Sequence, residues 1–217
     1  MIEKNDELQR LSRTDALTGL ANRRHLDEML ATEFRRSCRY KVPFTIALAD
    51  IDFLKSVNNE HRHPAGDDVL VRVAETMRRT LRESDGGGRF GGEEFLAVLS
   101  NSDCAGARIF AERWRQGVEG TKVELESGET VCVTISIGIA CWVPELDSPL
   151  AMIRWADEAL YRAKASGRNR ICVYSGAEGN EDAVPVSSNS WSSILSCSTR
   201  SRSALTSTVG IARACSK

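Results

Sequence analysis

Hydrophobic positions along the chain follow two patterns, a repeat of three to four residues and short continuous apolar runs. The spacing of Leu26, Leu30 and Phe34 predicts an amphipathic helix from about residue 22 to 39. The run FTIALADI (44–51) follows, and it is short enough for a buried strand. The same patterns predict further helices at about 53–60, 65–82, 103–119 and 148–167, and further strands at 121–126, 130–140 and 170–174.

A turn signal lies between two of the apolar segments. Gly91 and Gly92 separate Arg89-Phe90 from the strand-like EEFLAVL (93–99), which predicts a β-hairpin. The whole order is helix, strand, two helices, hairpin, helix, strands, helix and strand. It predicts one α/β domain over residues 13–175, with helices flanking a mixed, mainly antiparallel central sheet.

The two ends of the chain differ from this domain. Residues 1–12 carry scattered apolar side chains among charged ones, which fits either a helical stalk or a plain linker. Residues 176–217 contain eleven serines and no acidic residue after Asp182. No periodicity is sustained there, so the composition predicts a disordered tail.

Composition narrows the class of protein. Hydrophobic residues make up 41% and charged residues 27%, and the net charge is -1. A chain so nearly neutral has no basic field for nucleic acid, and no nucleic-acid partner is expected. No apolar run approaches the roughly 18 residues of a membrane span, and the first ten residues hold no signal-peptide segment. We therefore expect a cytoplasmic protein without direct membrane insertion.

The seven cysteines have no metal-binding pattern. No two stand at Cys-x-x-Cys spacing, which argues against a zinc knuckle or a redox pair. Cys132 and Cys172 lie within apolar stretches and are expected to be small buried side chains in a reducing cytoplasm.

The hairpin carries the first candidate chemistry. Gly91 and Gly92 lack a Cβ, so the backbone can turn tightly and approach a ligand. Glu93 and Glu94 follow at once, and two neighbouring carboxylates favour a bound cation. A solvated turn with no ligand is the competing interpretation.

A second candidate lies where the first strand ends. Asp50 closes the apolar run, and free backbone amides follow as the chain enters a helix. Carboxylate oxygen suits magnesium, a helix start suits phosphate, and Lys55 adds a positive charge. A helix cap without metal is the alternative.

Two further groups are weaker signals. Asn58, His63 and Asp67 follow the second candidate, and their donors and acceptors could recognise a purine edge. Lys164 and Arg168 end the last helix, where basic residues bind phosphate or simply complement the helix dipole.

Together these groups resemble the GGDEF domain family, the catalytic module of diguanylate cyclases, over residues 13–174. The resemblance implies the ferredoxin-like palm fold of nucleotidyl cyclases and the condensation of two GTP molecules into cyclic di-GMP. The motifs that carry it are DALTGLANRR (15–24), DIDFLK (50–55), GD (66–67), RFGGEEF (89–95), SIG (136–138), ADEALY (156–161) and KASGR (164–168).

The resemblance implies a role for each matching residue. Two Mg²⁺ ions per active site would be held by the side chains of Asp50, Glu93 and Glu94 and the carbonyl of Ile51. Glu93 would also accept the proton of the attacking hydroxyl. The remaining substrate contacts would come from the backbone amides of Phe53 and Leu54 and the side chains of Lys55, Asn58, His63, Asp67, Lys164 and Arg168.

The resemblance also implies regulation. Each domain would hold one GTP, so a homodimer would be needed for turnover, controlled through residues 2–12 or by an upstream sensor module. Arg82 and Asp85 match the family's Arg-x-x-Asp site, through which cyclic di-GMP acts as product and feedback inhibitor. Five residues separate Asp85 from Gly91, the family's usual placement. A charge pair at a helix end is the alternative for these two residues.

The chain departs from the family pattern at several positions. Asn59 and Arg62 stand where Asp and Gly are usual, and a positive φ at Arg62 would cost about 1–2 kcal/mol. Leu54 replaces a frequent Phe, and the glycines at 86–88 should loosen the strand before the hairpin. Two other functions therefore stay open, a catalytically degenerate receptor for GTP or cyclic di-GMP and a cyclase with relaxed base choice.

Overall fold

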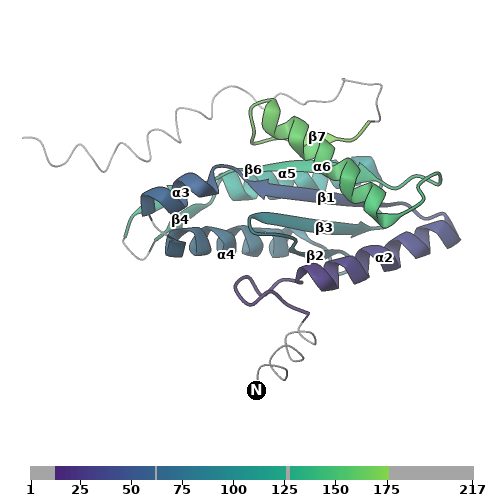
Figure 1. The fold of residues 1–217 in the computed structure, drawn as a ribbon, viewed down its shortest axis with the longest axis horizontal. Coiled ribbons are helices and arrows are strands. Elements are labelled where there is room, and N and C mark those ends of the chain that lie inside the picture. Colours follow the sequence, from purple (N-terminus) through teal and green to yellow (C-terminus); the bar gives the residue numbers. More distant parts are fainter. Residues whose placement is uncertain (1–12, 62, 126–127, 176–217) are drawn as a thin grey trace, which may run out of the picture.

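A computed structural model describes residues 13–61, 63–125 and 128–175 (Figure 1). Within these ranges β6 and β7 pair in parallel and the other strand pairs are antiparallel. The predicted fold class, a mixed and mainly antiparallel sheet flanked by helices, is confirmed. The central sheet has the order β2 (Gly86–Arg89), β3 (Glu94–Ser100), β1 (Phe44–Ile51), β6 (Ile135–Cys141) and β7 (Ile171–Val173), and β4 (Lys122–Glu124) pairs with β5 (Thr130–Cys132) in a second sheet.

Helices cover both faces of the central sheet (Figure 1). One face packs against α2 (Arg23–Tyr40) and α6 (Pro149–Ala165). The other packs against α4 (His63–Thr80) and α5 (Cys104–Glu119). The short helix α3 (Leu54–His61) follows β1 directly and contacts α4.

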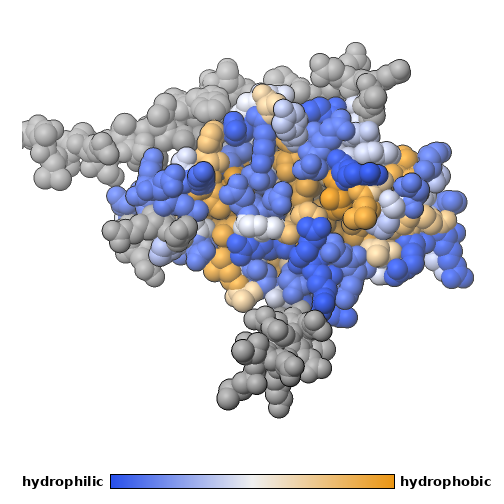
Figure 2. Space-filling view, viewed as in Figure 1, coloured by the Kyte–Doolittle hydropathy of each residue, from blue (hydrophilic) through white to orange (hydrophobic). Residues whose placement is uncertain are grey.

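The central strand β1 divides the apolar core into two clusters. Ile46 and Leu48 belong to the cluster under α2 and α6, whereas Ala47 and Ala49 belong to the cluster under α4 and α5. Figure 2 shows apolar residues along the middle of one face of the molecule with polar residues around them. Because successive side chains of a strand point to opposite faces, Asp50 lies on the same face as Leu48, the face of α6.

Helix starts follow the local sequence. Asn22 is the N-cap of α2 and accepts a hydrogen bond from the amide of His25 at 3.1 Å. Asp103 caps α5 in the same way, accepting from the amide of Gly106 at 2.8 Å. Pro149 opens α6 after Ser148, in the position where a missing amide hydrogen costs nothing. The helices expected from the apolar repeat are therefore present at the expected places.

Two strand predictions need correction. Residues 130–140 form two strands, β5 and β6. The chain leaves the second sheet after β5 and enters the central sheet after Val133–Thr134. There, Asp52 binds Thr134 through its backbone amide at 2.8 Å and its carboxylate at 2.7 Å, which fixes the crossing point. The glycines at 86–88 form the regular edge strand β2, in register with β3. Gly88 lies so close to Ala21 that any side chain would overlap its carbonyl.

The prediction that Cys132 and Cys172 are buried is confirmed for Cys172 and wrong for Cys132, which is only half-buried. Cys104 and Cys141 form a disulfide, with Cα atoms 5.7 Å apart. The residues are 37 positions apart in sequence, and only the meeting of α5 with the end of β6 brings them together.

No helix in the three described ranges combines the length and apolar character that crossing a bilayer requires. The predicted stalk at 1–12 and the predicted tail at 176–217 lie outside the described residues, so both stay predictions.

Candidate active site

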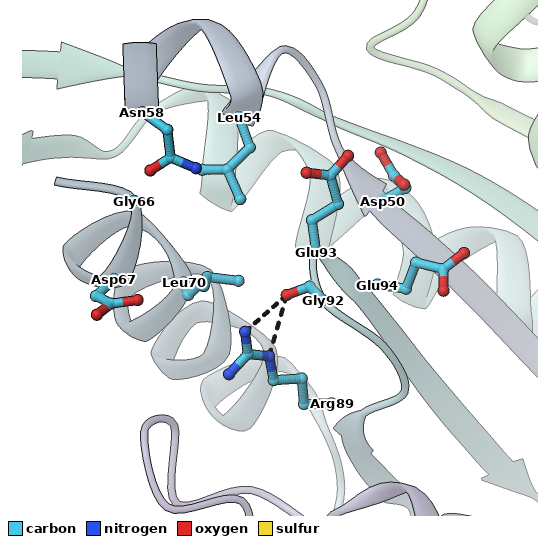
Figure 3. Close-up of a pocket in the computed structure, with 10 residues that line it drawn as sticks. All are labelled: Asp50, Leu54, Asn58, Gly66, Asp67, Leu70, Arg89, Gly92, Glu93 and Glu94. Carbon is cyan, nitrogen blue, oxygen red and sulfur yellow. Dashed lines mark hydrogen bonds between the residues drawn. The ribbon is translucent and has the colours of Figure 1, made fainter. Parts of the chain in front are cut away.

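Three carboxylates meet where β1 ends and β3 begins. Asp50 is the cross-strand partner of Glu94, and the amide of Ile51 donates to the carbonyl of Glu93 at 3.3 Å. Paired antiparallel residues have Cα atoms about 4.5–5.5 Å apart, so the acids are immediate neighbours. Figure 3 shows Glu93 and Glu94 pointing in different directions, with Asp50 beside them. The sequence could not say whether strand end and hairpin meet; the register brings them together.

The hairpin turn is held from outside by Arg89. Its guanidinium donates to the carbonyl of Gly92 from Nη2 at 2.7 Å and from Nε at 3.1 Å (Figure 3). Its Nη1 lies 3.5 Å from a carboxylate oxygen of Asp15. Burial alone would raise the pKa of Asp15, but hydrogen bonds from Thr18 and the charge of Arg89 outweigh it and lower that pKa. Arg89 stood within the RFGGEEF motif, yet its role in fixing the turn was missed.

One ammonium group balances Asp50, the most buried of these three acids. Lys164 Nζ lies 2.8 Å from Asp50 Oδ2, and Asp50 is 6% exposed. This contact depends on close packing of α6 on β6, since a Cβ at Gly138 would overlap the backbone of Ala156 and Leu160. Burial raises the pKa of Asp50 even so, and the neighbouring Asp52 adds to the rise against the effect of Lys164.

The other two acids are also hard to ionise. Burial raises the pKa of Glu93, and the negative charge of Asp50 raises it further. The same two causes raise the pKa of Glu94, with Asp157 of α6 adding to them and Lys164 opposing them. Three acids therefore share one end of the sheet with less positive charge than they need, which is the electrostatic condition that attracts a cation.

The site suits a hard divalent ion, although the ligands are not yet gathered around one point. Among the described residues, no three acidic, histidine or cysteine side chains converge tightly enough to hold a metal ion unaided. Lys164 occupies the position next to Asp50 that a cation would share. Carboxylate and carbonyl oxygens are the donors that Mg²⁺ prefers, and Asp50, Glu93, Glu94 and the carbonyl of Ile51 supply only such donors.

A cleft of about 520 Å³ opens beside these acids (Figure 3). One wall of it carries an unusual polar group: Asn58 Oδ1 is buried and has no hydrogen-bond partner among the described residues. Gly66 makes room for it, because a Cβ there would overlap the amide of Asn58. The cleft is lined by Asp50, Leu54, Asn58, Gly66, Asp67, Leu70, Arg89, Gly92, Glu93 and Glu94.

Leu54 lines this cleft, and the other predicted phosphate-binding residues lie outside its lining. Phe53 has φ 61° and is 53% exposed, and the Arg168 guanidinium carbon lies 4.6 Å from the centre of its ring. Lys55 is exposed at the start of α3. The side chain of His63 and the whole of Arg62 lie outside the described residues, so their predicted effects are untested.

Asp52 is a second acid in the DIDFLK motif, and no role for it was predicted from the sequence. It is 3% exposed and accepts hydrogen bonds from Thr134 Oγ1, Ser136 Oγ and the amide of Asn169 at 2.7, 2.8 and 3.0 Å. These contacts tie the end of β1 to β6 and to the loop after α6. Alternation along the strand was the available signal, but it could not separate this structural acid from the candidate ligand Asp50.

Arg82 and Asp85 lie at a different cleft. The cleft is about 470 Å³ and is also lined by Arg13, His25 and Arg78. The carboxylate of Asp85 accepts a hydrogen bond from the backbone amide of Arg82 at 3.1 Å, and Arg82 itself is exposed. Local turn geometry thus accounts for part of this motif.

The fold and this site define a class of protein: a palm-like α/β domain with paired carboxylates at the end of its central strands, next to a polar cleft. The family model described as "Diguanylate cyclase, GGDEF domain" matches residues 12–170. The chain belongs to the GGDEF domain family.

Known proteins agree with this assignment. The chain is 40% identical over 167 residues to Response regulator PleD of Caulobacter vibrioides, covering 76% of this chain and 37% of PleD. It is 35% identical over 172 residues to Diguanylate cyclase A of Treponema denticola, covering 78% and 46%. The chain thus spans less than half the length of these relatives.

Solved structures share the fold. The GGDEF domain of DgcB from Caulobacter crescentus, in complex with c-di-GMP, has a TM-score of 0.73 and 30% identity, covering 75% of this chain and 96% of that one. Diguanylate cyclase SiaD of Pseudomonas aeruginosa, in complex with its activator SiaC, has a TM-score of 0.72 and 39% identity, covering 80% and 66%.

Proposed function

We propose that this chain is a diguanylate cyclase that condenses two GTP molecules into cyclic di-GMP and two pyrophosphates. The observation that carries the proposal is the meeting of Asp50, Glu93 and Glu94 beside a cleft with an unpaired buried amide oxygen. The relatives named as diguanylate cyclases and the c-di-GMP complex of a structural neighbour support it.

The residues divide between metal and substrate. Asp50, Glu93 and Glu94 with the carbonyl of Ile51 would hold two magnesium ions, which supply Lewis-acid stabilisation of the phosphate oxygens when bound. Asn58 and Asp67 face the cleft and would read the guanine edge, because an amide and a carboxylate together offer donors and acceptors. Lys55, Lys164, Arg168 and the amides of Phe53 and Leu54 would bind the phosphates.

The bond changes balance without any further reagent. The 3′-oxygen of one GTP attacks the α-phosphorus of the other, and the bond from that phosphorus to the bridging oxygen of the β-phosphate breaks. Pyrophosphate leaves with the electron pair, and Glu93 accepts the proton of the hydroxyl. A second round closes the ring.

Two copies of the chain are needed in this scheme. Each cleft takes one GTP, so the sites of a homodimer must face each other for one 3′-hydroxyl to reach the other α-phosphate. The relatives extend well beyond the matched region, which supports control of this encounter by further modules such as a sensor. Residues 2–12 keep their predicted role as a stalk or linker.

Feedback inhibition by cyclic di-GMP is proposed for the second cleft. Arg82 can clamp a phosphate or a guanine edge, and Asp85 can accept from guanine. The nearby Arg13 and Arg78 add positive charge for a dianionic ligand. The neighbour solved with c-di-GMP supports a product-binding GGDEF domain in general, without bearing on these residues.

The test is a turnover assay on purified protein with GTP and Mg²⁺, with the dinucleotide identified by chromatography. The expected result is cyclic di-GMP from the natural chain and none from Glu93→Gln, which should stay folded. Glu145→Gln is the matched control, because Glu145 lies after β6 at the opposite end of the sheet. It should turn over normally.

Other outcomes select the other functions. A dimeric natural chain that binds GTP or cyclic di-GMP without turnover would be a receptor. An adenine-containing product from ATP would mean relaxed base choice, the alternative that Asn59 and Arg62 leave open. Full turnover by Glu93→Gln would contradict the roles given to that side chain.

A further inference from the structure

The loop after α6 adopts a backbone that needs outside support. Gly167, Arg168 and Asn169 have φ values of 115°, 61° and 47°. A left-handed conformation costs a non-glycine residue about 1–2 kcal/mol, so contacts elsewhere must hold the two side-chain-bearing residues. Arg168 is the residue that matters for function, since its guanidinium lies over Phe53 beside the start of α3.

Asn169 makes those contacts in three directions. Its amide donates to Asp52 Oδ2 at 3.0 Å, its Oδ1 accepts from Arg115 Nη1 at 2.7 Å, and its Nδ2 donates to Glu119 Oε1 at 2.9 Å. One residue thus joins helix α5 to the turn between β1 and α3.

The arginine that binds Asn169, Arg115, is buried and paired with two carboxylates. It is 1% exposed, yet it lies on α5 away from both clefts. Glu112 accepts from it at 2.6 and 3.0 Å and Glu119 at 2.8 Å, which neutralises the buried charge. A buried arginine with its geometry fixed on both sides by carboxylates is a rigid support for Asn169.

We infer that Arg115 and Asn169 are positioning residues that set the Arg168 guanidinium for the triphosphate of GTP. The path runs from Arg115 through the side chain of Asn169 to the left-handed backbone of Arg168. This inference rests on the proposed function, in which Arg168 binds phosphate. It adds two residues that touch neither substrate nor metal.

The test is a double-mutant cycle of Asn169→Gly and Arg168→Ala. Glycine tolerates φ 47° and keeps the amide bond to Asp52, so Asn169→Gly removes only the links to Arg115 and Glu119. We expect kcat/KM for GTP to fall about tenfold in the natural background. In the Arg168→Ala background the same change should cost less than about twofold, because the group being positioned is gone.

Asn101→Gly is the matched control. Asn101 also has a positive φ, 50°, and its Oδ1 accepts from an arginine, Arg36 Nη2, at 2.9 Å, but it follows β3 at the opposite end of the sheet. It should leave the domain folded and kcat/KM unchanged. Equal losses of kcat/KM in both variants, additive losses in the cycle, or no loss from Asn169→Gly would each overturn the inference.

The cycle separates this inference from the proposed function. If the natural chain binds GTP and does not turn it over, the cyclase proposal fails. The inference is then tested by the same cycle, with the dissociation constant for GTP and Mg²⁺ in place of kcat/KM. If the natural chain neither binds nor converts GTP, both fail.

Discussion

The two ends of strand β1 meet opposite demands. At the first end, Thr45 donates to the carbonyl of Ser102 at 2.8 Å, and the Cys104–Cys141 disulfide ties α5 to β6. Polar groups there are matched by local partners. At the other end, Asp50 has one ammonium partner and two neighbouring glutamates, and burial raises the pKa of all three acids.

The difference shows that this fold leaves buried charges incompletely paired at one end of β1 only. A protein of ordinary stability satisfies its buried charges, and a cluster that violates the rule marks a functional site. Both ends belong to one strand and are buried, with Thr45 0% and Asp50 6% exposed, so the contrast does not come from a difference in fold or burial. It comes from placing three acids beside a single ammonium group.

The largest expected effect comes from substituting one buried polar residue at each end of β1. Asp50→Asn should lower kcat by at least about 10³-fold, because it removes a metal ligand, and should leave the domain folded. Thr45→Val at the other end should leave kcat unchanged and cost about 1 kcal/mol of stability from its lost hydrogen bond. Steady-state kinetics and thermal melts measure both, and a kcat within tenfold of natural for Asp50→Asn would contradict the comparison.

The next effect concerns Asp52, the acid whose hydrogen bonds are all made within the protein. Asp52→Asn loses a carboxylate that accepts three hydrogen bonds and should cost about 2–3 kcal/mol of folding free energy. That corresponds to a melting temperature about 4–12 °C lower. Asp147→Asn on an exposed loop is the control and should shift it by less than about 1 °C. Equal shifts would mean that Asp52 is not the anchor described.

A smaller effect separates the two clefts. Arg82→Ala should weaken inhibition by cyclic di-GMP about tenfold, the value of one charge-assisted contact, without changing the initial rate. The measurement is the initial rate of pyrophosphate release at increasing cyclic di-GMP. Unchanged inhibition would return Arg82 and Asp85 to the alternative of a charge pair at a helix end.

The smallest effect is on stability without metal. Because the pKa of Glu93 is raised in the folded state, its contribution to stability is fully present below the usual carboxyl range of about 4–4.5 and is lost as pH rises through the folded pKa. Glu93→Gln should therefore melt above the natural chain at pH 7.5 in chelator. The gap should close as the pH falls toward about 4.5. A natural chain that is the more stable of the two at pH 7.5 would refute this account of Glu93.

Much of the fold could be predicted from the sequence because its signals are local. The apolar repeat, the N-cap at Asn22 and the proline that opens α6 are contained within single elements. The division of 130–140 into two strands depends on Asp52 binding Thr134 across the fold, and the Cys104–Cys141 bond depends on two distant elements meeting. Neither leaves a local pattern.

The site was predictable in its residue types and less so in its supports. Asp50, Glu93 and Glu94 stand out because carboxylates at a strand end and a glycine turn are unusual neighbours. Asn169 and Arg115 look like ordinary polar residues, and their role depends on contacts over 50 or more positions in sequence. Only the folded chain shows which acid is an anchor and which lacks a partner.

The most direct test of the central claim is to locate a divalent ion. Crystals of the protein with Mn²⁺ and a non-hydrolysable GTP analogue give an anomalous signal at the metal. The account predicts an ion within about 2.0–2.6 Å of carboxylate oxygens from both Asp50 and Glu93, with Lys164 displaced from its contact with Asp50. Bound nucleotide with Lys164 still on Asp50 and no ion between the strands would contradict it.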